Sequence, residues 1–317
     1  MDRKALVRLT HDSGNSLNLD NTTYKQWVFR YTFLELEKDL GLYGDITSDI
    51  AFPFPRTERF KIVAKSNGIL AGRQEIEYFL SDKTTNLRQK LVGSLDVKFF
   101  VKEGAGFAKG DVLAEIYGEV KDILAVERTV LNLLNRMSSV ATNAAKAVSI
   151  SSEFDALLTP TRKTLWGLLD KRACNVGGTG THRLNLSDAV LLKDTHLDVD
   201  GRNFYDFFVK LKNSSIDFRF AEIEVSRITE VIEVCKLFND FNLPIVGVVM
   251  MDNMSPELIN EALSSVKGMG LYDSILFEAS GGINDQNLFE YAKTGVDIIS
   301  MGSLTSGVAG VDISMEF

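Results

Sequence analysis

Hydrophobic and polar positions along the chain predict two regions of different architecture. In the first 120 or so residues, Tyr24–Lys38 has an amphipathic helical pattern, and the rest consists of short β-rich segments. The expected strands of this region are Arg59–Ala64, Gly68–Ala71, Val97–Val101 and Val112–Tyr117. Gly104, Gly106 and Gly110 separate the later segments as turns. The first region is therefore expected to combine a helix with a small sheet.

The second region has the pattern of a parallel α/β sheet. A long helical pattern runs from Glu119 to about Ile150, and short apolar segments then alternate with amphipathic helices. The expected strands are Ala156–Leu158, Ala189–Leu192, Phe220–Val225, Ile245–Met251, Ser274–Phe277 and Val296–Ser300. The expected helices between them are Asn203–Lys212, Ile228–Asn239, Pro256–Val266 and Asp285–Lys293. Six or seven such units fit an incomplete barrel, and they fit a doubly wound open sheet almost as well.

Polar residues follow nearly every expected strand of the second region. Because the carboxyl ends of parallel strands meet at one edge, the side chains after those strands are candidates for a shared site. The early strands are followed by basic groups, namely Arg162, Lys163, His182, Arg183 and Lys193. The middle strands carry the carboxylates Glu222, Glu224 and Asp252. The late strands end in turns that contain Ser280, Gly281, Gly282 and Gly302.

The net charge of the chain indicates which kind of ligand these residues could bind. The 317 residues contain 35 Lys and Arg against 43 Asp and Glu, a net charge of −8. Such an acidic chain is a poor general binder of nucleic acid or anionic membranes, so a local group of cations indicates a multiply anionic ligand. Late glycines let backbone N–H groups approach phosphate. Glu224 and Asp252 could hold Mg²⁺ on a polyphosphate, because Mg²⁺ prefers carboxylate and phosphate oxygens.

Other features of the sequence indicate the class of protein and its cellular compartment. The longest uncharged apolar run, near Leu243–Met251, is far shorter than the ~20 residues that span a bilayer. Cys174 and Cys235 are far apart and are expected to be buried small hydrophobic residues, which favours a reducing, cytoplasmic compartment. Trp27 is expected in the core. His11, near the N-terminus, is expected to be mobile and without a role.

Ordered motifs over about residues 40–317 resemble those of the quinolinate phosphoribosyltransferases, also called carboxylating nicotinate-nucleotide pyrophosphorylases. The motifs are GDIT at 44–47, AVER at 125–128, SSVAT at 138–142, TRKT at 161–164, HR at 182–183, LKDTH at 192–196, EIEV at 222–225, MDNM at 251–254, EASGGI at 278–283 and TGVDIISMG at 294–302. Several positions depart from the family pattern, among them Thr181 and Thr195, which replace common small or amide residues. Pro160 precedes TRKT, Trp166-Gly167 replaces a Pro-Gly pair, and Ser306 stands in place of a late histidine.

The resemblance implies a fold and a domain division. The family fold is an N-terminal α/β sandwich followed by an incomplete, six- to seven-stranded α/β barrel. Residues 1–130 would form the sandwich, with 304–317 returning to it, and residues 131–303 would form the catalytic barrel.

The resemblance also implies roles for individual residues. Arg162, His182, Arg183 and Lys193 would bind the two carboxylates of quinolinate, and Arg128 would join them from the neighbouring subunit of a homodimer. Lys163 and Lys193 would contact the phosphoribosyl pyrophosphate donor. Glu224 and Asp252 would bind the ribose and Mg²⁺. Phosphate would be held by Ser280, Gly281, Gly282 and Gly302.

The activity implied is phosphoribosyl transfer to quinolinate with decarboxylation, a step of de novo NAD biosynthesis. Two alternatives stay open. One is a related transferase with another acid substrate, such as the molybdenum-transport-associated relatives, which usually lack the lysine found here at Lys193. The other is a non-catalytic anion-binding homologue, against which the intact Glu224 and Asp252 argue.

Overall fold

A computed structural model of the chain describes residues 2–81, 93–199, 201 and 203–317, which form two compact units. Unit 1 consists of Met1–Gly14, Lys146–Leu165 and Thr179–Ser306, and unit 2 of Asn15–Ala145, Trp166–Gly178 and Gly307–Phe317. The division differs from the boundaries near 130 and 303 that the sequence suggested. The N-terminal segment belongs to unit 1, and the long helix α6 (Val120–Ile150) contributes residues to both units.

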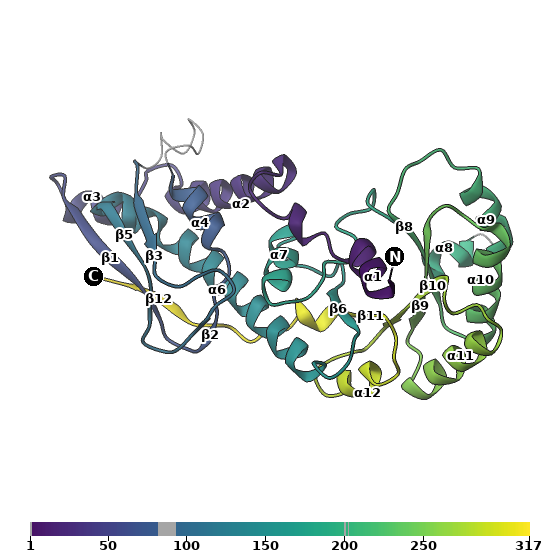
Figure 1. Cartoon of the computed structure of the whole chain (residues 1–317). Helices are drawn as coiled ribbons and strands as arrows, with labels where there is room; N and C mark the ends of the chain where they lie inside the picture. Colours follow the sequence, from purple (N-terminus) through teal and green to yellow (C-terminus); the bar gives the residue numbers. More distant parts are fainter. Residues whose placement is uncertain (1, 82–92, 200, 202) are drawn as a thin grey trace. The chain divides into compact units, whose positions relative to one another are not determined.

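Unit 1 is built on a parallel sheet of six strands (Figure 1). The strands are β6 (Leu157–Pro160), β7 (Val190–Leu192), β8 (Phe220–Val225), β9 (Val246–Asp252), β10 (Ile275–Ser280) and β11 (Ile298–Met301). Its helices are α1 (Arg3–His11), α8 (Asp194–Val199), α9 (Phe204–Lys212), α10 (Ile228–Phe241), α11 (Pro256–Gly268) and α12 (Leu288–Ala292), followed by the short η2 (Gly302–Leu304). Every strand pair of this sheet is parallel.

Strand order decides between the two architectures that the sequence left open. The order is β6-β11-β10-β9-β8-β7, so the strands from β7 to β11 lie beside their neighbours in sequence and the last strand, β11, pairs with the first, β6. A doubly wound sheet would instead reverse its order at a switch point. This cyclic order is that of an α/β barrel with one missing strand contact, between β6 and β7. The expected incomplete barrel is confirmed.

Apolar residues from the start of each barrel strand form a core with α1. The cluster contains Val7, Leu157, Ala189, Phe220, Val248, Leu276 and Ile298. Asp2 caps α1 by accepting from Ala5 N at 2.7 Å. Arg3 then donates to Asp297 Oδ2 and to the Ile275 carbonyl oxygen, both at 2.7 Å. Helix α1 therefore covers the amino ends of the strands, an element the sequence pattern did not predict.

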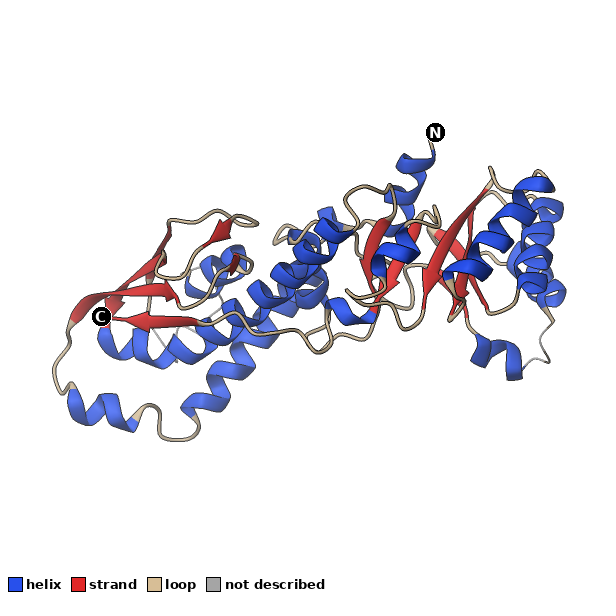
Figure 2. Ribbon diagram, turned by 90° about the horizontal axis from the view of Figure 1, so that it is seen from below, coloured by secondary structure: helices blue, strands red, loops and turns tan. Residues whose placement is uncertain are grey.

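Unit 2 contains the small sheet expected in the first region, and its strands pair in antiparallel fashion (Figure 2). Its four-stranded sheet has the order β12-β1-β5-β3, and β2 pairs with β4. The strands are β1 (Thr57–Ala64), β2 (Gly68–Ile69), β3 (Asp96–Phe99), β4 (Gly106–Phe107), β5 (Val112–Glu119) and β12 (Ile313–Glu316). The helices are α2 (Thr22–Leu40), α3 (Ile46–Ala51), α4 (Arg73–Leu80), α6 up to Ala145 and α7 (Leu168–Val176), with η1 (Gly14–Ser16) at the start.

Two predictions about large or reactive side chains have different outcomes. Cys174 and Cys235 are fully buried, as expected, and both are free thiols. Trp27 is 44% exposed, so its assignment to the core was wrong. Helix α2 instead buries Tyr24, Val28 and Leu36, which occupy another face of the same helix. Among the residues that the structure describes, no helix has both the length and the apolar character needed to cross a membrane.

Candidate active site

A pocket of about 750 Å³ lies in unit 1, where the barrel strands end. Thr161 follows β6, Lys193 follows β7, and Asp252 and Ser280 are the last residues of β9 and β10; all four line the pocket. The other lining residues among those predicted are Arg162, Lys163, His182, Arg183, Glu224, Gly281, Gly282 and Gly302. Arg128 does not line it; this side chain is exposed on the part of α6 that belongs to unit 2.

The basic residues form one part of the pocket lining. Arg162 and Lys163 are exposed, whereas Arg183 is 5% exposed and donates from Nη1 to the Ala189 carbonyl oxygen at 3.3 Å. Burial lowers the pKa of Arg183, and the positive charge of Arg162 lowers it further. The two guanidinium groups therefore repel each other across the pocket. A bound anion would relieve that repulsion.

The carboxylates of the pocket face a lysine. Lys193 Nζ lies 3.3 Å from Glu224 Oε2. Burial raises the pKa of Glu224, the charge of Lys193 opposes this shift, and the charge of Asp252 adds to it. The opposing effects of Lys193 and Asp252 show that both charges act on Glu224. Together, these three side chains can bind a cation, or a polar ligand that carries both positive and negative charge.

The turn after β10 is tightly built. Gly281 has a φ of +92°, and a Cβ there would lie 2.4 Å from Asn253 Oδ1 and 2.6 Å from Asn253 N. Asn253 itself has a φ of +55° and donates from its backbone to the Ser280 carbonyl oxygen. Gly302 lies near the Lys163 side chain, 3.5 Å from Cδ to the place a Cβ would occupy. Glycine is required at 281, since a side chain would collide with neighbouring backbone.

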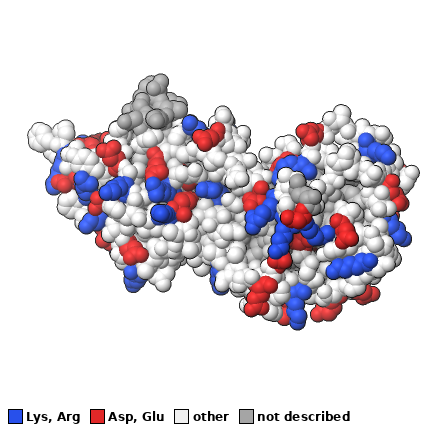
Figure 3. Space-filling view, viewed as in Figure 1, with Lys and Arg blue, Asp and Glu red and all other residues white. Residues whose placement is uncertain are grey.

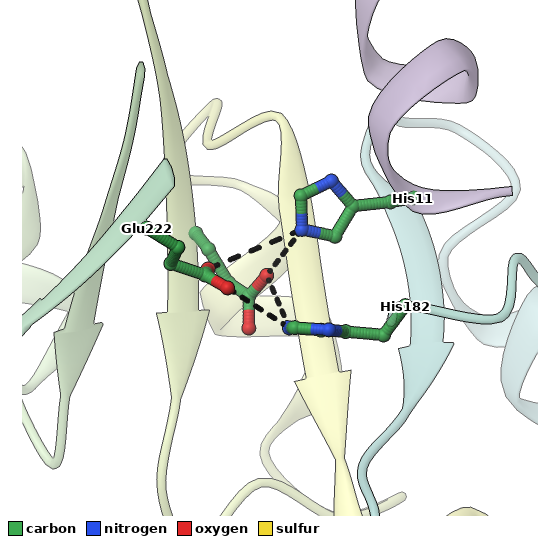
Figure 4. Close-up of side chains that lie close together, drawn as sticks. His11, His182 and Glu222 are labelled. Atoms are coloured by element: carbon green, nitrogen blue, oxygen red, sulfur yellow. Dashed lines mark ion pairs between the residues drawn. The ribbon is translucent and has the colours of Figure 1, made fainter. Parts of the chain in front are cut away.

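His182 points into the barrel interior, where two buried glutamates lie (Figure 4). Its Nε2 lies 3.3 Å from Glu222 Oε2 and 3.4 Å from Glu278 Oε2. The side chain is almost fully buried, and the residue has a φ of +53°, a strained conformation for a non-glycine residue. The ring therefore lies between the pocket and the buried carboxylates.

His11 is not mobile, so the expectation from the sequence was wrong. The residue is fully buried at the end of α1, and its carbonyl oxygen accepts from Thr181 N at 2.7 Å and from His182 N at 2.9 Å. Its Nε2 lies 3.3 Å from Glu278 Oε2. Sequence position suggested a free terminus, but α1 packs on the barrel and carries His11 into its interior.

Burial and mutual charge shift the ionisation of this interior group. Burial lowers the pKa of His11 to about 4. Burial and the charge of Glu278 raise the pKa of Glu222 to about 7. Burial alone would lower the pKa of His182, but the charges of Glu278 and Glu222 outweigh it and raise the value to about 9. The charges of Glu222 and Glu278 thus favour a proton on the His182 nitrogen that faces them, whereas burial favours a neutral His11.

Several polar lining residues were not singled out from the sequence as site residues. They are Thr161, Asn253, Asn284, Ser303 and Ser306. Their common signal is position, because each lies just after a barrel strand. Ser306, at the position where the family pattern has histidine, donates from Oγ to the Gly302 carbonyl oxygen at 2.8 Å. The substituted serine therefore supports the glycine turn beside Lys163.

Comparison with known proteins identifies the family. Residues 140–316 match the family model described as "Quinolinate phosphoribosyl transferase, C-terminal domain", and residues 45–138 match the corresponding N-terminal domain. The chain belongs to the quinolinate phosphoribosyltransferase family. The expected family fold is thereby confirmed.

Relatives of this family cover nearly the whole chain. A protein of Bacillus subtilis strain 168 named "Probable nicotinate-nucleotide pyrophosphorylase [carboxylating]" is 33% identical over 291 residues, 91% of this chain and 92% of the relative. A protein of the same name from Methanothermobacter thermautotrophicus is 32% identical over 89% of this chain and 95% of its own. The solved nicotinate-nucleotide pyrophosphorylase of Francisella tularensis is 27% identical, with a TM-score of 0.78 over 92% of this chain and 96% of that one.

Substitution of the paired glycines tests the construction of the turn after β10. We expect Gly281→Ala to lower the free energy of unfolding by about 3 kcal/mol, because the new Cβ adds overlap with Asn253 to the backbone strain. Gly282→Ala is the matched control: its φ is +64° but no atom lies within 4 Å, so strain alone should cost about 1–2 kcal/mol. Urea unfolding of both variants measures the difference; equal losses would contradict the predicted contact.

Proposed function

We propose that this chain transfers the phosphoribosyl group of phosphoribosyl pyrophosphate to quinolinate and removes one carboxylate, as its relatives' names describe for them. The products are nicotinate mononucleotide, pyrophosphate and CO₂. One observation carries the proposal: a single pocket brings together the cations Arg162, Lys163 and Arg183, the pair Lys193 and Glu224, and the glycine turns. Such a lining suits two anionic substrates whose reacting atoms must come together in one pocket.

The basic side of the pocket suits the dicarboxylic acid. Arg162 is exposed to the pocket and has a planar guanidinium that can pair with a carboxylate through two hydrogen bonds. Arg183 and Lys193 can neutralise the second carboxylate. His182 also lines the pocket, and its ring is positioned there by its contacts with Glu222 and Glu278. We therefore assign quinolinate to the Arg162 side of the pocket.

The glycine turns of the pocket lining suit the phosphorylated donor. Gly281 and Gly282 have left-handed backbone conformations that expose the chain, and Ser280 and Gly302 complete the surface. Backbone N–H groups in such turns can donate to phosphate oxygens. Lys163, whose side chain lies beside Gly302, can add a positive charge to the same phosphate group. We therefore assign phosphoribosyl pyrophosphate to these turns.

Glu224 and Asp252 fit a magnesium ion. Both carboxylates line the pocket, and the charge of Asp252 raises the pKa of Glu224, so the two groups act on a common space. An oxygen-only ligand set is the one that Mg²⁺ prefers, usually with substrate phosphate oxygens. When bound with the donor, the ion would offset negative charge on the pyrophosphate leaving group.

The chemistry then requires alignment rather than an enzyme nucleophile. The quinolinate ring nitrogen attacks the anomeric carbon, and the bond from that carbon to pyrophosphate breaks. Lys163 and Lys193 can stabilise the negative charge that develops on the departing pyrophosphate. The nitrogen is then quaternary, so the adjacent carboxylate leaves as CO₂ and its bonding electrons stay on the ring carbon. That carbon takes a proton to give nicotinate mononucleotide.

We further propose that the enzyme is a homodimer in which Arg128 completes the partner's pocket. Arg128 is exposed and is not part of the described pocket lining of its own chain. The family resemblance assigns this arginine to the neighbouring subunit's site. We place the enzyme in the cytoplasm, which agrees with its two free, buried cysteines.

A turnover assay tests the function directly. We expect the purified chain to release pyrophosphate from phosphoribosyl pyrophosphate with quinolinate, but not with nicotinate, and to form nicotinate mononucleotide detectable by chromatography. Arg162→Lys should lower kcat/KM by roughly 30-fold, about 2 kcal/mol, because lysine cannot form the two-pronged pair.

The control for that variant is Arg227→Lys, which changes a surface arginine of the same unit paired only with Glu230 among the described ion pairs. It should keep wild-type turnover. Full activity of Arg162→Lys would contradict the assignment of the acid. Turnover with another acid but none with quinolinate would favour the relative of different specificity, and no turnover with any acid would favour a non-catalytic protein.

Magnesium dependence is tested by omission. Turnover should be lost when Mg²⁺ is left out and recover when Mg²⁺ alone is added. Asp252→Asn should raise the Mg²⁺ concentration needed for half-maximal rate, because one negative ligand is lost. Asp240→Asn, on an exposed part of α10, should leave that concentration unchanged. Undiminished turnover without Mg²⁺ would refute the metal role.

Subunit mixing tests the role of Arg128. Arg128→Ala and Arg162→Ala should each be inactive dimers. Mixed in equal amounts with free exchange, they should recover about a quarter of wild-type activity per site, since half of the dimers are hybrids and one site in each hybrid has both arginines. If mass spectrometry shows hybrids but no activity returns, Arg128 does not act across the dimer.

A further inference from the structure

Four ionisable side chains meet in the barrel interior, below the pocket (Figure 4). His11 comes from the end of α1, His182 from the segment before β7, Glu222 from β8 and Glu278 from β10. His11, Glu222 and Glu278 have no exposed surface, and His182 is 5% exposed. One nitrogen or oxygen of each residue lies within 4.8 Å of the others. Of the four, only His182 lines the active-site pocket.

Hydrogen bonds assign the proton of each imidazole. The Thr10 hydroxyl donates to the Leu6 or Val7 carbonyl oxygen, at 2.9 and 3.0 Å, so its oxygen accepts from His11 Nδ1 at 2.8 Å. His11 Nε2 then carries only a lone pair. The backbone N–H of Arg183 donates to His182 Nδ1 at 2.7 Å, which leaves the His182 proton on Nε2.

The cluster therefore has too many acceptors. His11 Nε2 and the four carboxylate oxygens of Glu222 and Glu278 are buried and have no hydrogen-bond partner within the described part of the chain. His182 Nε2–H is one donor for five acceptor atoms. Two buried carboxylates without compensating partners cost several kcal/mol each. A cation at this position would satisfy both the charge and the lone pairs.

The spacing of the atoms suits metal coordination better than hydrogen bonding. His11 Nε2 lies 3.3 Å from Glu278 Oε2 and 4.0 Å from Glu222 Oε1. Charge-assisted hydrogen bonds are shorter, about 2.7–2.9 Å. Ligand atoms that surround an ion at about 2.1 Å lie about 3.4 Å apart in a tetrahedron and up to about 4.2 Å apart across the ion. The 4.0 Å distance falls within that range, and the 3.3 Å distance is about 0.1 Å below its lower end.

We propose that His11 Nε2, Glu222 and Glu278 bind a divalent transition-metal ion, with Zn²⁺ as the best match. One imidazole and two carboxylates form a mixed nitrogen and oxygen set that suits Zn²⁺ better than Mg²⁺ or Ca²⁺. The two carboxylates neutralise the ion. His182 Nε2–H lies 3.3 Å from Glu222 Oε2 and 3.4 Å from Glu278 Oε2, so it faces both carboxylates from outside the proposed ligand set, as outer partners of metal sites do.

This site is separate from the proposed magnesium site. Glu222 and Glu224 are two residues apart on β8, so they lie on the same face of the strand at different depths. Glu224 lines the pocket, whereas Glu222 does not. A closed, fully buried site is typical of structural metals. The ion would attach α1 to the barrel strands, because His11 ends α1 and the two glutamates belong to β8 and β10.

Metal content of the full chain tests the site. The chain is unfolded in chelator, refolded with Zn²⁺ and desalted, and its metal is measured by mass spectrometry. We expect about one Zn²⁺ per chain, a loss of at least roughly tenfold in content in His11→Ala and Glu278→Gln, and a higher Tm for the chain refolded with Zn²⁺ than without it.

Two control variants separate the site from other ligands. His196→Ala removes the remaining histidine of the chain, which is exposed, and Asp252→Asn weakens the pocket carboxylates; both should keep the zinc. Retention of zinc in His11→Ala would overturn the proposal. So would a native chain that refolds without zinc to the same Tm, in which case protons on Glu222 fill the cluster. If His11→Ala fails to fold, the zinc content of Glu278→Gln and the Tm of the native chain refolded with and without Zn²⁺ decide whether the site binds zinc.

Discussion

Parallel pairing of the first barrel strand with the last is the constraint on which the rest of the molecule depends. Because β11 pairs with β6, six strands curve round one axis and all their carboxyl ends point the same way. Residues that are up to 145 positions apart in sequence, from Thr161 to Ser306, therefore line one pocket. The same curvature creates an interior that must be filled at the opposite end, and α1 fills it with Val7 and His11.

The pocket and the barrel interior need ligands of opposite charge. In the pocket, exposed cations are held close together in an acidic protein, an arrangement that an anionic ligand stabilises. In the interior, Glu222 and Glu278 are buried with few donors, an arrangement that a cation stabilises. On the face shown in Figure 3, acidic and basic side chains are interspersed on both units. Each of the two places is specific for a ligand of one charge because side chains of the opposite charge gather there locally, and not because the protein has a large charged surface.

His182 connects the two places. Its ring contacts the buried carboxylates while the residue also lines the pocket. Its strained backbone is fixed by hydrogen bonds from Thr181 and His182 to the His11 carbonyl oxygen. Helix α1 therefore influences the basic side of the pocket without lining it.

Sequence by itself determined the repeating pattern, since buried parallel strands such as β8 are continuously apolar except for residues with another function. It also placed Lys193, Asp252 and Gly281 at or just after the ends of strands, because that position depends only on local order. Tertiary structure alone decided the rest. Whether the sheet closes depends on pairing between β6 and β11, which have 137 residues between them in sequence, and no local pattern records that pairing. The burial of His11 depends on where α1 docks, so its chemistry could not be read from a polar N-terminal segment.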